Sequence, residues 1–219
     1  MIKNVILDWS GTLADDLSPV IKATNHVLEE YGKPTMSRDE FCKEFSLPFE
    51  DFYRRFLPEA SIEELDARYH YYFDPLNEHV ELLPFAINFL QFCQRTKRRT
   101  FLLSTINPEH FNKQAARLKV KHYFEHPYTG IWDKAKRIHS ILEEKKLHPE
   151  ETIFIGDMVH DIETAHHGGI TGVAVTTGYD TVEKFIAAKA KIILKNLQEL
   201  QRLMECGECS SSTSFPNAP

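Results

Sequence analysis

The apolar residues of this chain alternate between short continuous runs and longer runs that follow a helical period. The short runs are rich in Val, Ile, Leu and Phe, which is typical of strands buried on both faces. They lie at 2–7, 99–104, 152–156, 172–176 and 190–194. The helical runs that separate them lie at 85–94, 108–118 and 134–146. Strands that alternate with helices in this way predict right-handed crossovers and a parallel β-sheet flanked by helices, which is an α/β fold.

One block of the sequence interrupts this alternation. Residues 15–82 show helical periods and no strand pattern, in segments at 18–31, 37–45, 48–56 and 61–73. In the third segment Phe49, Phe52, Tyr53 and Phe56 are spaced i, i+3, i+4 and i+7, so they form one apolar stripe along a helix. Such a stripe is typical of the core of a helical bundle. We therefore predict a helical domain at 15–82, inserted into a core made of 1–14 and 83–204.

The charge balance of the chain argues against a nucleic-acid partner. The 26 Lys and Arg residues face 32 Asp and Glu residues, a formal net charge of −6, whereas nucleic-acid-binding domains carry a basic surface. No apolar run approaches the ~18 residues of a membrane span, and no secretory signal precedes the first strand. Four cysteines are too few for a disulfide framework in 219 residues. We expect a cytoplasmic protein with no membrane partner.

The C-terminal residues differ in composition from the rest of the chain. Cys206 and Cys209 form a single Cys-x-x-Cys pair, and a serine-rich segment with a proline follows them. Without a second pair, a metal site of the zinc-ribbon type is not indicated. We predict that 205–219 form a disordered tail.

Polar residues follow the strands at the positions where catalytic groups are found in open α/β sheets. Asp8, Ser10, Gly11 and Thr12 come directly after the first strand, where glycine lets backbone N–H groups approach an anion and threonine adds a hydroxyl donor. The other strand-end candidates are Ser104, Thr105, Asp157 and Asp161. Because ligands bind beyond the carboxyl ends of parallel strands, we expect these side chains to converge on one pocket.

The order and spacing of these motifs resemble the haloacid dehalogenase superfamily, and in particular its phosphoglycolate phosphatase-like members with a helical cap. Asp8-x-Ser10-Gly11-Thr12 matches motif I, and the strand that ends at Ser104 matches motif II. Lys134 stands at a helix start, as the lysine of motif III does, and 152–161 match motif IV. The resemblance implies a Rossmann-like core, a cap domain at 15–82, a Mg²⁺ cofactor and phosphoryl transfer from a small phosphorylated metabolite to an aspartate.

The resemblance also implies a role for each matched residue. Asp8 would be the nucleophile, and Lys134 would hold the phosphate together with Gly11, Thr12, Ser104 and Thr105. The metal ligands would be Asp8, the backbone carbonyl of Ser10, Asp157 and Asp161. Two of these assignments have a competitor in the sequence, since Lys136 is close to Lys134 and Thr105 directly follows Ser104.

Ser10 is the departure from the family pattern that bears most on function. Motif I of the phosphatases reads Asp-x-Asp, and its second aspartate moves the proton during catalysis, which a serine hydroxyl cannot do near neutral pH. A phosphoric monoester hydrolase slowed by this change is the first hypothesis. A phosphonoacetaldehyde hydrolase-like enzyme, for which Lys43 would have to supply the Schiff-base amine, is the second, and an impaired phosphate-binding regulatory protein is the third. Asp15 and Asp16 are interpreted as hinge residues.

Overall fold

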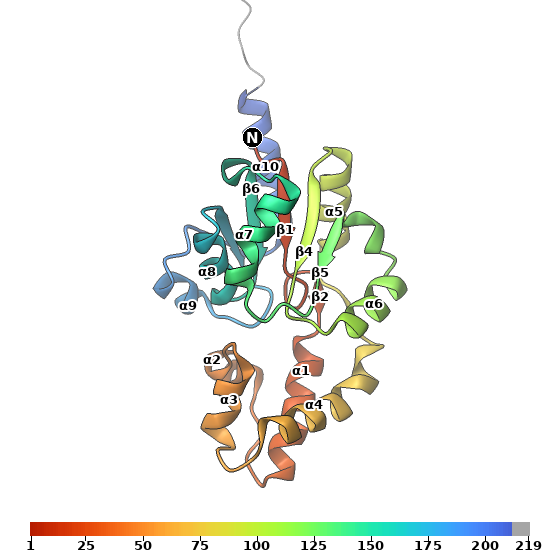
Figure 1. The fold of residues 1–219 in the computed structure, drawn as a ribbon, viewed down its shortest axis with the longest axis vertical. Helices are drawn as coiled ribbons and strands as arrows, with labels where there is room; N and C mark the ends of the chain where they lie inside the picture. Colours follow the sequence, from red (N-terminus) through yellow and green to blue (C-terminus); the bar gives the residue numbers. More distant parts are fainter. Residues whose placement is uncertain (212–219) are drawn as a thin grey trace, which may run out of the picture.

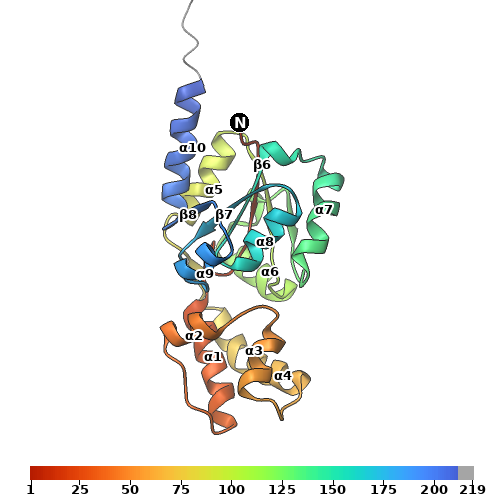
Figure 2. The same ribbon diagram turned by 90° about the vertical axis from the view of Figure 1, so that its left-hand side faces the viewer.

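The computed structural model describes the backbone of residues 1–211 and the side chains of residues 1–206. Six parallel strands form one sheet in the order β5-β4-β1-β6-β7-β8. The strands are β1 (Asn4–Leu7), β4 (Arg99–Leu103), β5 (His126–Tyr128), β6 (Thr152–Gly156), β7 (Thr171–Val175) and β8 (Ile192–Leu194). The predicted parallel α/β fold is confirmed, because helices cover both faces of this sheet (Figures 1 and 2).

The central strand shows why apolar runs form this sheet. β1 is flanked by β4 and β6, with Val5 paired to Thr100 on one side and to Ile153 on the other. Successive side chains point to opposite faces: Val5 and Leu7 pack with α5 (Ala86–Arg95) and α6 (Pro108–Arg117), whereas Ile6 packs beneath the helices of the other face. Every residue of β1 is therefore buried.

The other helices of the core complete the two layers. They are α7 (Lys134–Lys145), α8 (Val159–His167), α9 (Val182–Ala187) and α10 (Leu197–Ser211), with short 3₁₀ turns η1 (Lys121–Tyr123) and η2 (Pro149–Glu151). α7 and α8 lie on one face of the sheet, and α5 and α10 lie on the other (Figure 2). None of the helices in the described part of the chain has the length and apolar content needed to cross a membrane.

The last helix extends further than the sequence suggested. α10 continues to Ser211, so 205–211 of the segment expected to be disordered belong to a helix. Leu197 and Leu200 are buried against the core, where they anchor the start of this helix. Residues 212–219 and the side chain of Cys209 lie outside the described residues.

Residues 17–77 form a second group of helices, which we call the helical unit. It consists of α1 (Leu17–Glu30), α2 (Arg38–Glu44), α3 (Phe49–Phe56) and α4 (Ile62–Asn77). In the stripe on α3, Phe52 and Tyr53 are buried and Phe49 and Phe56 partly so. The unit lies beyond the carboxyl end of β1 (Figure 1), so it faces the edge of the sheet where the strand-end polar residues gather.

Two chain crossings connect the helical unit to the core, and they run side by side. β2 (Ala14–Asp15) and β3 (Glu81–Leu82) pair in antiparallel fashion. The sequence did not predict this pair, because two-residue strands are too short to show a period. Asp15, on β2, is exposed, and the next residue, Asp16, is buried.

Candidate active site

Four charged side chains from three separate segments converge beyond the carboxyl end of the sheet. Asp8 follows β1, Asp157 follows β6, Asp161 lies in the first turn of α8, and Lys134 is the first residue of α7. Lys134 Nζ donates hydrogen bonds to Asp8 Oδ1 at 2.9 Å and to Asp161 Oδ1 at 2.7 Å. All four residues are buried. The predicted convergence of Asp8, Lys134, Asp157 and Asp161 is thus present in the structure.

This cluster carries more negative than positive charge. Asp8, Asp157 and Asp161 each offer a carboxylate oxygen, and these oxygens lie within 4.8 Å of one another. Burial, reinforced by the neighbouring carboxylates, raises the pKa of Asp157 well above its usual range, and burial raises the pKa of Asp161 to about 7. Burial alone would lower the pKa of Lys134, but Asp161 and Asp8 raise it. A set of buried oxygens with excess negative charge has the chemistry of a site for a hard divalent cation.

Motif I residues hold Asp157 in place. Thr12 Oγ1 donates to Asp157 Oδ1 at 2.9 Å, and the backbone N–H of Tyr179 donates to Asp157 Oδ2 at 2.9 Å. Gly11 has a φ of +67°, and a Cβ at this position would collide with the Asp157 carboxylate. The sequence assigned Gly11 and Thr12 to phosphate binding. In the structure the Thr12 hydroxyl binds Asp157, and the backbone N–H of Gly11 donates to Asp16.

A cavity of about 330 Å³ lies between the helical unit and this end of the sheet. Residues that carry polar or charged groups line its base: Asp8, Ser10, Asp16, Thr105 and Lys134. The helical unit supplies a wall that includes Phe45, Leu47, Phe49, Phe52 and Tyr69, together with the polar residues Asp66 and His70. Trp132 of the core meets Phe49 with ring centroids 5.6 Å apart. The candidate nucleophile therefore opens onto a cavity whose wall carries several aromatic side chains.

The structure separates the two pairs of competing candidates. Lys134 is buried against Asp8, whereas the side chain of Lys136 is 88% exposed and pairs with Asp133. Of the hydroxyls after β4, Thr105 lines the cavity. Ser104 is buried, and its Oγ accepts a hydrogen bond from the backbone N–H of Ile106 at 3.3 Å. Of these two residues, Thr105 is therefore the one that borders the cavity.

Asp16, which the sequence interpretation placed among the hinge residues, is buried and lines the cavity. Its carboxylate accepts hydrogen bonds from Gly11 N at 3.2 Å and from Tyr179 Oη at 3.3 Å, and the Ser10 hydroxyl donates to it as well. Burial raises the pKa of Asp16 to about 7, against the opposing effect of the Ser10 hydrogen bond. No pattern in the sequence marks Asp16, because β2 has only two residues and shows no period.

Known proteins resemble this chain over most of its length. The model of the haloacid dehalogenase-like hydrolases matches residues 5–175. The phosphoglycolate phosphatase of Synechococcus elongatus is 21% identical over 199 residues, which cover 90% of this chain and 94% of that protein. Phosphoglycolate phosphatase 1 of Pseudomonas aeruginosa is 22% identical over 230 residues, which cover 97% of this chain and 82% of that protein.

Solved structures show the same architecture. A haloacid dehalogenase-like family hydrolase from Streptococcus pneumoniae superposes with a TM-score of 0.82 at 23% identity, over 93% of this chain and 98% of that one. This likeness agrees with the sheet order and with the helices on both faces. Since the family model spans well over half of the sequence, the chain belongs to the haloacid dehalogenase-like hydrolase family, as its motifs predicted.

Proposed function

We propose that this protein is a Mg²⁺-dependent phosphatase that hydrolyses a small phosphomonoester through an aspartyl-phosphate on Asp8. The observation that carries the proposal is the buried Asp8–Lys134 pair at the base of the cavity, with Asp157 and Asp161 beside it. A carboxylate is a competent nucleophile toward phosphorus when cationic groups offset the repulsion between two anions. The names of the curated relatives point to the same class of reaction.

The residues present fit a Mg²⁺ ion. Asp8, Asp157 and Asp161 offer buried carboxylate oxygens, the backbone carbonyl of Ser10 would complete the set, and Mg²⁺ binds oxygen ligands of this kind. Bound there, the ion would neutralise charge on the phosphoryl group and on the carboxylates. The helical unit acts as the cap in this proposal, since it closes the cavity over Asp8.

The chain's own residues account for the first chemical step. Lys134 fixes Asp8 Oδ1, which leaves Oδ2 to form the new bond to phosphorus. The bond between phosphorus and the leaving oxygen breaks, its electron pair stays on that oxygen, and a proton neutralises it. Water then attacks the phosphorus of the aspartyl-phosphate, which releases inorganic phosphate and restores the Asp8 carboxylate.

Asp16 supplies the proton in this proposal, in place of the family's second motif I aspartate. It lines the cavity together with Asp8 and receives a hydrogen bond from Ser10, so its carboxyl group lies beside the position that the missing aspartate would occupy. As an acid it donates to the leaving oxygen, and as a carboxylate it then accepts a proton from the attacking water. Ser10 therefore does not remove proton transfer from the site.

We expect Asp16→Asn to slow the turnover of alkyl phosphates by about 10²–10⁴-fold, the usual contribution of a general acid or base. An aryl phosphate has a leaving group that needs little protonation, so its phosphoenzyme should form at a near-normal rate and then accumulate. Rapid-quench kinetics measure both steps. Asp15→Asn is the matched control, because Asp15 is exposed, and it should behave as wild type. A wild-type rate with alkyl phosphates in Asp16→Asn would refute the role of Asp16.

The cavity wall indicates the kind of phosphomonoester. No arginine lines the cavity, and Lys134, the one lysine among the described lining residues, is already paired with carboxylates. A leaving group with its own carboxylate would find no unpaired lysine or arginine among the described lining residues. Aromatic side chains instead favour an apolar leaving group. Lys43, which the phosphonatase hypothesis requires, is exposed and does not line the cavity.

A substrate panel tests the proposal. We expect Mg²⁺-dependent release of phosphate from aryl and apolar alkyl phosphates, with lower kcat/KM for phosphoglycolate. Phosphonoacetaldehyde and a haloacid complete the panel. Cleavage of phosphonoacetaldehyde alone would establish the second hypothesis, and phosphate binding without turnover of any compound would establish the third. Turnover that is unchanged after removal of divalent cations would exclude the proposed cofactor.

A further inference from the structure

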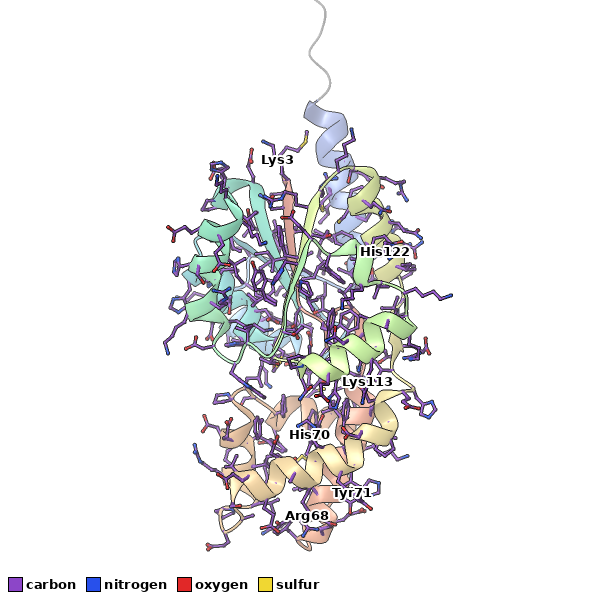
Figure 3. The ribbon with its side chains drawn as sticks, turned by 45° about the vertical axis from the view of Figure 1, so that its right-hand side comes forward. Lys3, Arg68, His70, Tyr71, Lys113 and His122 are labelled. Atoms are coloured by element: carbon purple, nitrogen blue, oxygen red, sulfur yellow. The ribbon has the colours of Figure 1, made fainter. Side chains whose placement is uncertain are left out.

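A second cluster of ligating side chains lies where the helical unit meets the core. His70 and Asp74 are spaced i, i+4 on α4, so they share one face of that helix, and His110 lies in the first turn of α6 on the opposite side of the junction. One donor atom from each of these residues falls within 4.8 Å of the other two. Figure 3 shows His70 on the side of the helical unit that faces α6, which carries Lys113.

The contacts within this cluster bring the three groups into direct proximity. His110 Nε2 lies 2.8 Å from Asp74 Oδ1, and the rings of His70 and His110 are 5.4 Å apart between centroids. Asp66 Oδ1 lies 3.6 Å from His70 Nε2, which is beyond hydrogen-bond distance, so the nearest carboxylate partner within the cluster is Asp74.

The donor chemistry of this cluster differs from that of the carboxylate site. Two imidazole nitrogens and one carboxylate oxygen form a set that suits Zn²⁺ and other first-row transition metals rather than Mg²⁺. His70 and His110 also line the cavity, so an ion held by them would keep coordination positions open to water. His110 is mostly buried, which fixes its ring before any ion arrives.

We propose that His70, Asp74 and His110 bind a divalent transition-metal ion of the Zn²⁺ type, which joins the helical unit to the core. α4 and α6 already meet through a hydrogen bond from Gln114 Nε2 to Asn77 Oδ1 at 2.7 Å, both residues being buried. An ion coordinated from both helices adds bonds across the same junction. It therefore holds the cavity closed and hinders exchange of whatever occupies it.

The first test measures Zn²⁺ binding to the full chain by competition with a chromophoric chelator, in saturating Mg²⁺ so that the carboxylate site is filled. We expect wild type to bind one Zn²⁺ ion. His70→Ala should weaken binding by more than about tenfold, since even the loss of a residue that only supports a ligand costs about 10–100-fold. His122→Ala, which removes an exposed histidine of the core, is the matched control and should bind as wild type.

Two results would overturn the metal site. The first is equal Zn²⁺ affinity in His70→Ala and wild type. The second is a loss of Zn²⁺ binding in Asp157→Asn that is as large as the loss in His70→Ala, which would place the ion with the carboxylates. His70 carries the test because it is only half-buried, whereas replacement of His110 also disturbs packing.

Hydrogen exchange tests the link between the two units separately. Zn²⁺ should slow amide exchange in 62–77 and 108–117 of wild type, and it should leave exchange in His70→Ala unchanged. Zn²⁺ that binds wild type without slowing exchange in either helix would contradict the joining role. Neither readout depends on phosphatase activity, so the proposal stands or falls independently of the proposed function.

Discussion

Asp8→Asn is expected to abolish the turnover of every phosphomonoester while the protein remains folded. An amide has the shape of a carboxylate and its oxygen still accepts the hydrogen bond from Lys134, but it is a poor nucleophile. Loss of a catalytic nucleophile costs up to about 10⁶ in kcat. Release of phosphate under steady-state conditions measures turnover, and thermal unfolding measures the integrity of the fold.

The phosphoenzyme gives the more direct readout of the same substitution. Wild type should form an acid-stable, hydroxylamine-sensitive phosphoprotein with an aryl phosphate, whereas Asp8→Asn should form none. Asp15→Asn, which changes an exposed carboxylate on β2, is the matched control and should keep both the phosphoenzyme and turnover. Detection of a phosphoenzyme in Asp8→Asn would assign the nucleophile to another residue.

Lys134→Met is expected to have the second largest effect, on both activity and stability. It leaves the Asp8 and Asp161 carboxylates buried without their ammonium partner, and the removal of one partner from a buried ion pair costs about 3–5 kcal/mol. The free energy of unfolding, measured by chemical denaturation in the presence of a chelator, should fall by an amount of this order. Turnover should fall as well, because the fixed cation beside Asp8 is gone.

Lys136→Met is the matched control, since it makes the same change two residues further along α7 at an exposed position. We expect it to leave turnover and the unfolding midpoint unchanged. Lys134→Arg retains the charge, so it should recover more stability than activity, because a guanidinium does not fit the space of an ammonium. Equal effects of the two methionine variants would show that Lys134 has no special role.

The sheet and its helices could be predicted from the sequence because each is encoded locally. An apolar run such as 152–156 is long enough to show that a strand is buried on both faces, and the alternation with helices then determines that the strands are parallel. β5 was not predicted because it lacks such a run: His126–Tyr128 contains a proline and only one fully buried residue. Short strands form because they pair with a strand that is distant in the sequence, and the local sequence carries no information about that pairing.

Some residues of the candidate site could be predicted from local sequence patterns, and others could not. The convergence of Asp8, Asp157 and Asp161 follows from their positions at the ends of parallel strands, so sequence reasoning could predict it. The inward turn of Asp16 depends on the pairing of β2 with β3, and the cluster around His110 depends on how α4 packs against α6. Contacts between elements far apart in the sequence decide both, and neither could be predicted from motifs.

The crowded carboxylates make the stability of the whole chain depend on its solution conditions. Asp161 has a usual pKa of 3.8 and about 7 in the folded protein, so between these values the folded state binds more protons than the unfolded state and loses stability as pH rises. In the proposed function, a divalent cation held by Asp8, Asp157 and Asp161 would supply the positive charge that the lost proton no longer provides. Above its dissociation constant, each tenfold increase in free cation adds about 1.4 kcal/mol to the free energy of unfolding. If the proposed cation site is correct, thermal unfolding should therefore shift to higher temperature as the concentration of free Mg²⁺ rises.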